Sequence, residues 1–589
     1  MDLSTRQGRR QQGARIGAAA EAAGLALTEL ATAIGCSRAL IYQYVSGQVL
    51  AQADRLQAIA RLVGRPLEWF YAEEAAAADS AAALPPAPIA ADPRQRASDL
   101  RTLAEAQSGP PDFGAARATC TRLVEAVAAL DDPQAVAEAQ WRLGQACFAL
   151  GDLEGTRAAV SGALEGFRAL GLDRRERSAR QTLGAALAGL GQRDKALAQF
   201  EAVIAGGDFD QEWRGRLGRA DVYESLGRGE AALAELEAAE RLIEAQPEGP
   251  KRSWAELYLG LATVNVYLLH DDFERAAAAA RRCAPLAEEL ACVGQHLEAC
   301  LNLGAARRQL LDWPGAAEAF DEAVRLARLT GDRERAAVAQ ACRADLWAAM
   351  GRLDEARAEA KAAIAEALSL GSARGELLGH LAASEACRRA GDANEALHHA
   401  QQAIAGAGAH ELVKIEALGR LAAAAARRQL GETAAAGIEE RRAAAIAERI
   451  GSRWTMAAAA LAQARAALAE DQLDAAAAQL EVGQRLGREI KAGELVLRAE
   501  GLAAELAARR GQSEEAAGLA AGAIEGWLAV RDGLLAAEIE AAPWEDAERL
   551  TVLRRCLKLL VENGAAERAA SLLEAIAWPP LTAEFAGRR

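Results

Sequence analysis

The chain has 589 residues, of which 51% are hydrophobic, 26% are charged and only 4% are aromatic. Alanine makes up about a quarter of them, and such small side chains favour helices packed closely on helices. The formal net charge is −15, but residues 1–72 hold eight Arg against five Asp and Glu, so this head carries +3 and residues 73–589 carry −18. A weakly basic head on an acidic body is typical of a nucleic-acid reader whose body does not bind nucleic acid.

The first 72 residues predict five short helices. A helix from about Ala14 to Ala23 is followed by an amphipathic helix over 25–35, which ends at the turn Gly35-Cys36. Ser37 is a candidate N-cap for the next helix, which has Ile41 facing inward and ends at Gly47. The segments "ADRLQAIARLVG" and "PLEWFY" supply the last two helices.

This pattern resembles the helix-turn-helix of the Cro/repressor (XRE) family, which binds double-stranded DNA. The matching positions are Leu25, Glu29-Leu30-Ala31, Ile34 to Ser37, Ile41, Gly47, Leu56, Ile59-Ala60 and Leu67. The family's frequent Gln at the start of the first motif helix is Leu27 here, and its Glu before the closing Gly is Val45.

The resemblance implies that five residues lie on the exposed face of a recognition helix in the major groove: Ser37, Arg38, Ala39, Tyr42 and Gln43. Arg suits the O6/N7 edge of guanine, Gln suits adenine, and Ala or Tyr can contact a thymine methyl group. An alternative is a helix-turn-helix that serves only to dock another protein.

Residues 73–98 form an Ala/Pro-rich linker. Prolines at 85, 86, 88 and 93 exclude a continuous helix and favour extended chain. The sequence therefore predicts three parts: a head at 1–72, the linker at 73–98 and a repeat body at 99–589.

Turn residues recur through the body with a period of 40. We call the series of positions spaced 40 residues apart the 40-residue ruler. It includes Gly151, Gly191, Gly351, Gly391, Gly431 and Gly511, and also Pro111, Asp271, Leu311 and Asp471. Two further turn residues depart from the spacing, Gly227 by being four residues early and Gly564 by following a longer gap. Five residues after these twelve turn positions the chain has Ala in eleven cases and Thr156 in one. A small residue there lets two helices approach closely, so each unit is predicted to be a helix pair.

The units resemble tetratricopeptide (TPR) repeats in a 40-residue form, through Trp141 to Gly144, Leu183-Gly184 with Phe200, and Leu303-Gly304 with Phe320. The predicted fold is thus all-α: a five-helix helix-turn-helix domain followed by a TPR-like right-handed α-solenoid of about twelve helix pairs.

Two sets of residues are candidates for ligand contacts in the concave groove of the solenoid. Asn265 and Asn302 match the places of two Asn residues in peptide-clamping TPR modules, where an amide donates to and accepts from a peptide backbone. The clamp's Lys and Arg are replaced by Leu261 and Cys342, and ordinary polar packing is the alternative.

The second set is a row of arginines, each three residues before its turn: Arg308, Arg388 and Arg428. Such a row suits a carboxylate ligand, whereas the alternative is that these arginines offset the helix dipole.

Motifs for chemistry are absent from the sequence. It has no G-x-x-x-x-G-K-[ST], no H-E-x-x-H and no nucleophile elbow, and His398-His399 is interpreted as a solvated pair. The nine cysteines form no C-x-x-C and are predicted to be buried apolar residues in a reducing compartment. We therefore expect no enzyme activity, no cofactor and no metal, and a cytoplasmic protein without a membrane segment.

A head and body of these kinds together resemble the peptide-sensing regulators of the RRNPP group. The resemblance implies a homodimeric transcription regulator whose solenoid binds a peptide or protein ligand and controls two DNA-binding heads. A TPR scaffold whose head docks protein rather than DNA is the alternative.

Overall fold

The computed structural model is all-α in the residues that it describes. These are residues 6–22, single positions and short stretches between 27 and 104, and residues 113–576 apart from 207, 227, 331, 411, 538 and 540–546. The chain divides into two compact units, residues 1–199 and 200–589.

The N-terminal head has its own apolar core. Helix α1 (Arg6–Ala22) supplies Ile16, and later segments supply Leu30, Ile41 and Leu56, all fully buried. The side chain of Gln12 accepts a hydrogen bond of 3.2 Å from the backbone of Ala51, which ties α1 to a segment 39 residues away. The predicted inward position of Ile41 is confirmed.

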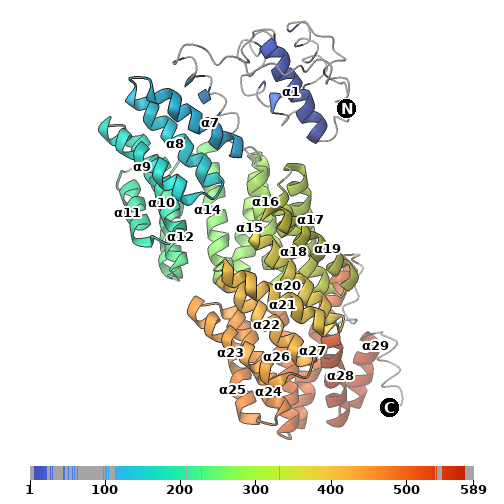
Figure 1. The fold of residues 1–589 in the computed structure, drawn as a ribbon. Helices are drawn as coiled ribbons and strands as arrows, with labels where there is room; N and C mark the ends of the chain where they lie inside the picture. The colour runs from blue at the N-terminus through green and yellow to red at the C-terminus, as the bar shows by residue number, and fades with distance from the viewer. Residues whose placement is uncertain are drawn as a thin grey trace. The chain divides into compact units, whose positions relative to one another are not determined.

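The repeat body consists of helices of 11 to 24 residues in the part of the chain that is described. From α8 onward they form pairs: α8 (Pro133–Ala149) with α9 (Leu153–Ala169), and so on to α28 with α29 (Figure 1). The other bounds are α7 (Phe113–Ala128), α10 (Asp173–Gly189), α11 (Arg193–Ile204), α12 (Phe209–Ser225), α13 (Gly229–Glu244), α14 (Pro250–Leu269), α15 (Phe273–Glu289), α16 (Val293–Gln309), α17 (Trp313–Thr330), α18 (Arg333–Met350), α19 (Leu353–Leu370), α20 (Ala373–Arg389), α21 (Ala393–Ala409), α22 (Val413–Gln429), α23 (Thr433–Ile450), α24 (Arg453–Ala469), α25 (Leu473–Glu489), α26 (Gly493–Arg509), α27 (Ser513–Ala536), α28 (Ala547–Glu562) and α29 (Ala566–Ile576).

The turn residue that ends a first helix adopts the left-handed conformation, which glycine tolerates best. Gly151, Gly391 and Gly564 have φ of 74°, 86° and 82°. Where the 40-residue ruler meets Asp271 or Leu311, these residues take the same conformation, with φ of 57° and 63°. Among the described residues the ruler therefore predicts the turn positions correctly, including those without glycine, while Pro111 and Gly227 lie outside this part of the chain.

Small residues let the two helices of a pair approach closely. Ala196, Ala316 and Ala396, each five residues after its turn, are fully buried. A Cβ built on Gly304 of α16 would lie 2.6 Å from the ring of Phe320 of α17, so only glycine fits there. The predicted two-helix units are confirmed, and the body is a TPR-like solenoid.

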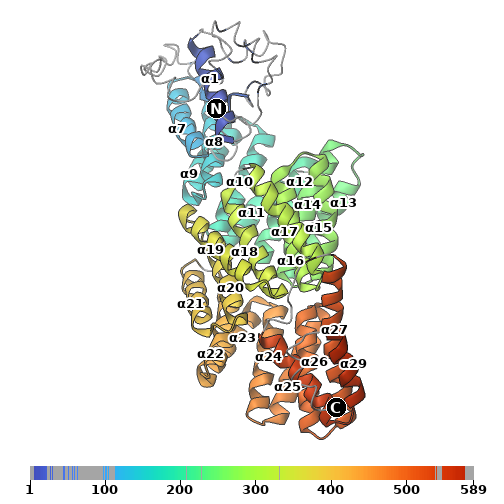
Figure 2. The ribbon, with the colours of Figure 1, turned by 90° about the vertical axis from the view of Figure 1, so that its right-hand side faces the viewer.

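First helices of neighbouring units also pack on one another. Within residues 200–589, α12 contacts α14, α14 contacts α16, and the same alternation continues to α26 with α28. Figure 2 shows α24 to α27 side by side. In a TPR-like solenoid this arrangement places the first helices along the inner, concave surface.

Another set of contacts joins helix pairs far apart in the sequence. The carboxylate of Asp271, at the α14–α15 turn, accepts hydrogen bonds from the hydroxyl of Ser452 (3.1 Å) and from the backbone N–H of Trp454 (2.8 Å) at the start of α24. It also accepts one from Lys414 Nζ at 3.1 Å. We call Asp271, Lys414, Ser452 and Trp454 the Asp271 clasp; it connects residues 181 and 183 positions apart.

Candidate DNA-binding head and ligand groove

The described part of the head shows how its core is closed. Tyr44 is 5% exposed and lies three residues after Ile41, on the same side of a helix. A Cβ on Gly13 would lie 2.3 Å from the carbonyl oxygen of Tyr44, so α1 packs directly on this backbone. The five predicted DNA contacts, Ser37, Arg38, Ala39, Tyr42 and Gln43, lie outside the described residues.

The residue six places before each turn lies where neighbouring first helices meet. Asp221, Asp345 and Glu385 share this position on α12, α18 and α20. Asp345 of α18 contacts Arg308 of α16, so the position lies between adjacent first helices, which line the concave side of a TPR-like solenoid. Burial raises the pKa of the Asp221 carboxyl to about 6.

Asn265 occupies the same position on α14, and the structure brings it together with Asn302 of α16. The amide of Asn302 donates to Asn265 Oδ1 at 2.9 Å, and the amide of Asn265 donates to Glu298 Oε1 at 3.4 Å. Both contacts join neighbouring first helices. The sequence places the two Asn residues on the groove side, and the structure adds that they form a hydrogen-bonded pair.

Exposed aromatic residues continue this surface along α14. Trp254 and Tyr258 stack with their centroids 5.7 Å apart and remain 40% and 37% exposed. The Tyr258 hydroxyl accepts a hydrogen bond of 3.0 Å from Gln295 of α16. We call Trp254, Tyr258, Asn265, Gln295 and Asn302 the α14–α16 strip. Large exposed aromatics beside amides are characteristic of surfaces that bind a partner.

The predicted arginine row is paired with carboxylates of its own chain. Arg308 lies 2.5 Å from Asp345, Arg388 lies 2.8 Å from Glu385, and Arg428 lies 2.6 Å from the buried carboxylate of Glu440. Burial raises the pKa of Asp345, although Arg308 opposes this effect. A ligand carboxylate would have to compete with these partners, so the role of the row in ligand binding stays a prediction.

Two groove carboxylates have no hydrogen bond or ion pair within the described residues. They are Asp221 and Glu224, three residues apart on α12. Burial, together with the charge of Asp221, raises the pKa of Glu224 to about 7. Sequence reasoning did not single out this pair, because its burial depends on how α12 packs against other helices.

The described cysteines are free and buried, except Cys342, which is half-buried. Burial raises the pKa of Cys120 and Cys300 to about 11, so these thiols are protonated at neutral pH. This confirms the predicted apolar role for most of them. None of the described helices has both the length and the apolar character needed to cross a bilayer.

These features define the class of the protein: it combines a helix-turn-helix head with a TPR-like body. Residues 16–70 match the helix-turn-helix family model HTH_3, and the chain therefore carries a domain of this type. No curated protein matches the chain.

Solved structures resemble the fold at low sequence identity. A Rap protein complexed with Competence and Sporulation Factor is 15% identical, with a TM-score of 0.44, over 64% of this chain and all of that one. The apo form of the quorum sensor NprR from Bacillus thuringiensis is 12% identical, with a TM-score of 0.43, over 60% of this chain and 97% of its own. Bacillus thuringiensis PlcR, in complex with the peptide PapR7 and DNA, is 14% identical, with a TM-score of 0.26, over 55% of this chain and 96% of its own.

Proposed function

We propose that the chain is a sequence-specific DNA-binding transcription regulator whose solenoid binds a peptide or protein ligand and controls the heads. The observation that carries the first half is the helix-turn-helix match over residues 16–70, together with the closed core built on Ile16, Leu30 and Ile41. The recognition residues in this proposal are Arg38 and Gln43, flanked by Ser37, Ala39 and Tyr42. The division into a head at 1–72, a linker at 73–98 and a body at 99–589 belongs to the same proposal.

In this proposal the protein acts in the cytoplasm as a homodimer, by binding rather than by catalysis. Two heads read half-sites about 34 Å apart, one helical turn of DNA, or a multiple of it. A ligand changes DNA affinity only through its different affinity for two arrangements of the body.

The ligand surface in this proposal is the α14–α16 strip. Asn265 and Asn302 offer amides that pair with a peptide backbone, and Trp254 and Tyr258 offer flat apolar area beside them. The unpaired Asp221 and Glu224 favour a ligand that carries a positive charge nearby.

Selection on a random duplex pool tests the DNA-binding half. The full-length protein is compared with an Arg38→Ala, Gln43→Ala double variant at two salt concentrations, and light scattering gives the oligomeric state. We expect a palindromic motif that the double variant loses, because direct base contacts each contribute about 1–3 kcal/mol of discrimination. No enriched motif from either the full chain or residues 1–72 would favour the protein-docking alternative.

Binding to a library of random-sequence peptides tests the ligand half. Trp254→Ala and Asn302→Ala should each weaken binding by about tenfold or more, since buried aromatic anchors contribute about 2 kcal/mol or more at interfaces. Leu329→Ala is the matched control, because Leu329 is 59% exposed and lies on the second helix α17. Equal effects of all three substitutions would contradict the assignment of the strip.

A further inference from the structure

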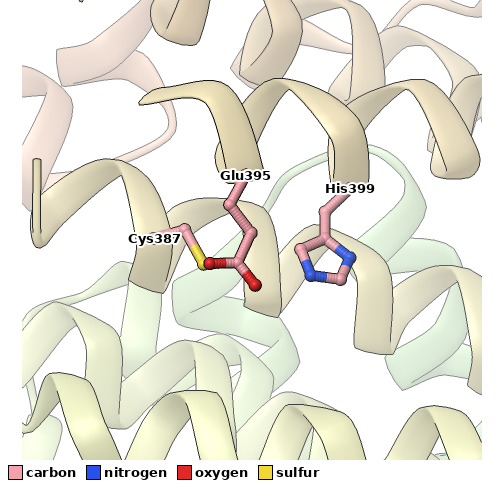
Figure 3. Close-up of side chains that lie close together, drawn as sticks. All are labelled: Cys387, Glu395 and His399. Atoms are coloured by element: carbon pink, nitrogen blue, oxygen red, sulfur yellow. The ribbon is translucent and has the colours of Figure 1, made fainter. Parts of the chain in front are cut away.

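A thiol, a carboxylate and an imidazole converge at the hairpin of α20 and α21. A ligating atom of each of Cys387, Glu395 and His399 lies within 4.8 Å of the other two (Figure 3). Glu395 and His399 are four residues apart, so they lie on one face of α21, and Cys387 faces them from the last turn of α20. The sulfur of Cys387 lies against the Glu395 carboxylate, and a ring nitrogen of His399 points toward the same carboxylate (Figure 3).

His399 is held in place by another histidine. Its Nδ1 lies 2.9 Å from Nδ1 of His380 on α20, and His380 is 9% exposed. Since this contact occupies Nδ1, Nε2 is the nitrogen of His399 that is available to another ligand. Histidines that bind metals usually donate their other ring N–H to a fixed acceptor, and Nδ1 of His380 lies where such an acceptor is needed.

A charged group beside the cluster is neutralised within the protein. The guanidinium near Cys387 belongs to Arg357, which is 3.5 Å from Asp392, so its charge is compensated.

The donor set selects the kind of ion. Ca²⁺ and Mg²⁺ prefer sites made only of oxygen, whereas Zn²⁺ takes thiolate, imidazole and carboxylate together. Bonds of about 2.0 to 2.3 Å require the three donor atoms to approach one another by about 1 Å. Glu395 is exposed at the surface and has room to move by this amount.

We propose that Cys387, Glu395 and His399 bind one Zn²⁺ ion through Sγ, a carboxylate oxygen and Nε2, with water as the fourth ligand. On binding, the ion displaces the thiol proton of Cys387, which leaves to solvent, and the S–H bond is replaced by an S–Zn bond. His380 acts as a positioning residue for His399. The ion fastens α20 to α21, beside Arg388 in the last turn of α20.

This site departs from the interpretation of His398-His399 as a solvated pair. His398 is exposed, but His399 is half-buried and turned toward His380 and Glu395. The Glu395 and His399 spacing was the available signal in the sequence. The approach of Cys387 and His380 across the hairpin depends on the fold.

The test uses full-length protein freed of metal by a chelator and titrated with Co²⁺, whose thiolate complexes absorb in the near ultraviolet. We expect this band at one equivalent per chain and its displacement by Zn²⁺. Cys387→Ser should abolish the band, and His399→Gln should weaken Co²⁺ affinity by at least a hundredfold. His380→Phe keeps an aromatic ring but removes the nitrogen, and should weaken affinity by about 10- to 100-fold.

His398→Gln is the matched control, because it removes the neighbouring imidazole outside the cluster. It should leave both the band and the affinity unchanged. Circular dichroism without metal shows whether each variant folds, and native mass spectrometry counts bound Zn²⁺. The proposal is overturned if wild-type protein gives no thiolate band, or if His398→Gln and His399→Gln weaken binding equally.

Discussion

The Asp271 clasp and Asp471 allow the same substitution to be compared at two equivalent turns. Both residues occupy the turn position of the 40-residue ruler, with φ of 57° and 56°. Replacing either Asp by Gly relieves about 1 kcal/mol of backbone strain, because an L-residue with a side chain disfavours the left-handed conformation. The side chains differ, because that of Asp271 is 2% exposed and that of Asp471 is 79% exposed.

We expect Asp271→Gly to destabilise the protein by about 3–5 kcal/mol. Removing one partner of a buried ion pair costs about 3–5 kcal/mol of folding free energy. For the pair of Asp271 with Lys414 we use the lower value of this range, about 3 kcal/mol, because Lys414 is 34% exposed and water can reach it. The Trp454 N–H loses its acceptor as well, which costs about 1–3 kcal/mol. Relief of backbone strain offsets about 1 kcal/mol of this sum.

Asp471→Gly should be neutral or stabilising by up to about 1 kcal/mol. It removes only the ion pair with Arg509 at 3.2 Å, a surface contact that contributes about 0.2–1 kcal/mol. Urea unfolding followed by circular dichroism compares the midpoints, and hydrogen exchange reports the Trp454 amide directly. Equal midpoint shifts for the two variants, or unchanged protection of Trp454 in Asp271→Gly, would refute the reasoning.

Two further predictions concern the groove and the helix pairs. The raised pKa values of Asp221 and Glu224 mean that the folded state holds protons more tightly than the unfolded chain, so these groups reduce stability as pH rises from about 4 to about 7. An Asp221→Asn, Glu224→Gln variant should therefore unfold at a higher temperature than wild type at pH 8 and at the same temperature near pH 4; thermal scans across pH check this, and a constant difference at every pH would contradict it. Gly304→Ala should destabilise by about 1–3 kcal/mol because the new methyl group meets Phe320, whereas Gly518→Ala, with open space around it, should stabilise by about 0.5–1 kcal/mol; urea midpoints of both variants give the signs.

The helix pairs and their turns were predictable because their causes are local. A left-handed residue every 40 positions and a small residue five places later depend only on neighbouring backbone, so the sequence is sufficient even at Leu311. In the head, Ile41 followed from helical periodicity in the same way. The pairing of Arg308 with Asp345 and of Arg428 with Glu440 depends on residues from other helices and was missed, whereas Arg388 pairs with Glu385 of its own helix.

Arg428 shows why the site was harder to predict than the fold. Its position in the last turn of α22 was clear from the ruler, but its partner Glu440 is 1% exposed in the next helix. Twelve residues separate the two, and that spacing places them across the helix pair. Within α22 alone, Arg428 was predicted to be available to a ligand carboxylate. The packing of α22 against α23 instead pairs its charge with Glu440.

Contacts between distant helix pairs bear on the proposed control of the heads by a ligand. Trp454 donates from its indole to Gln309 at 2.9 Å, and Arg389 of α20 donates to Glu494 of α26 at 2.9 Å, so residues 145 and 105 positions apart are fixed together. A change in curvature of the body must break such contacts or exchange them for others, and these contacts set its free-energy cost. A ligand that prefers the altered state by less than this cost leaves the population almost unchanged. Since Asp271→Gly lowers the cost, it should also raise ligand sensitivity if control passes through curvature, and leave it unchanged if control passes elsewhere.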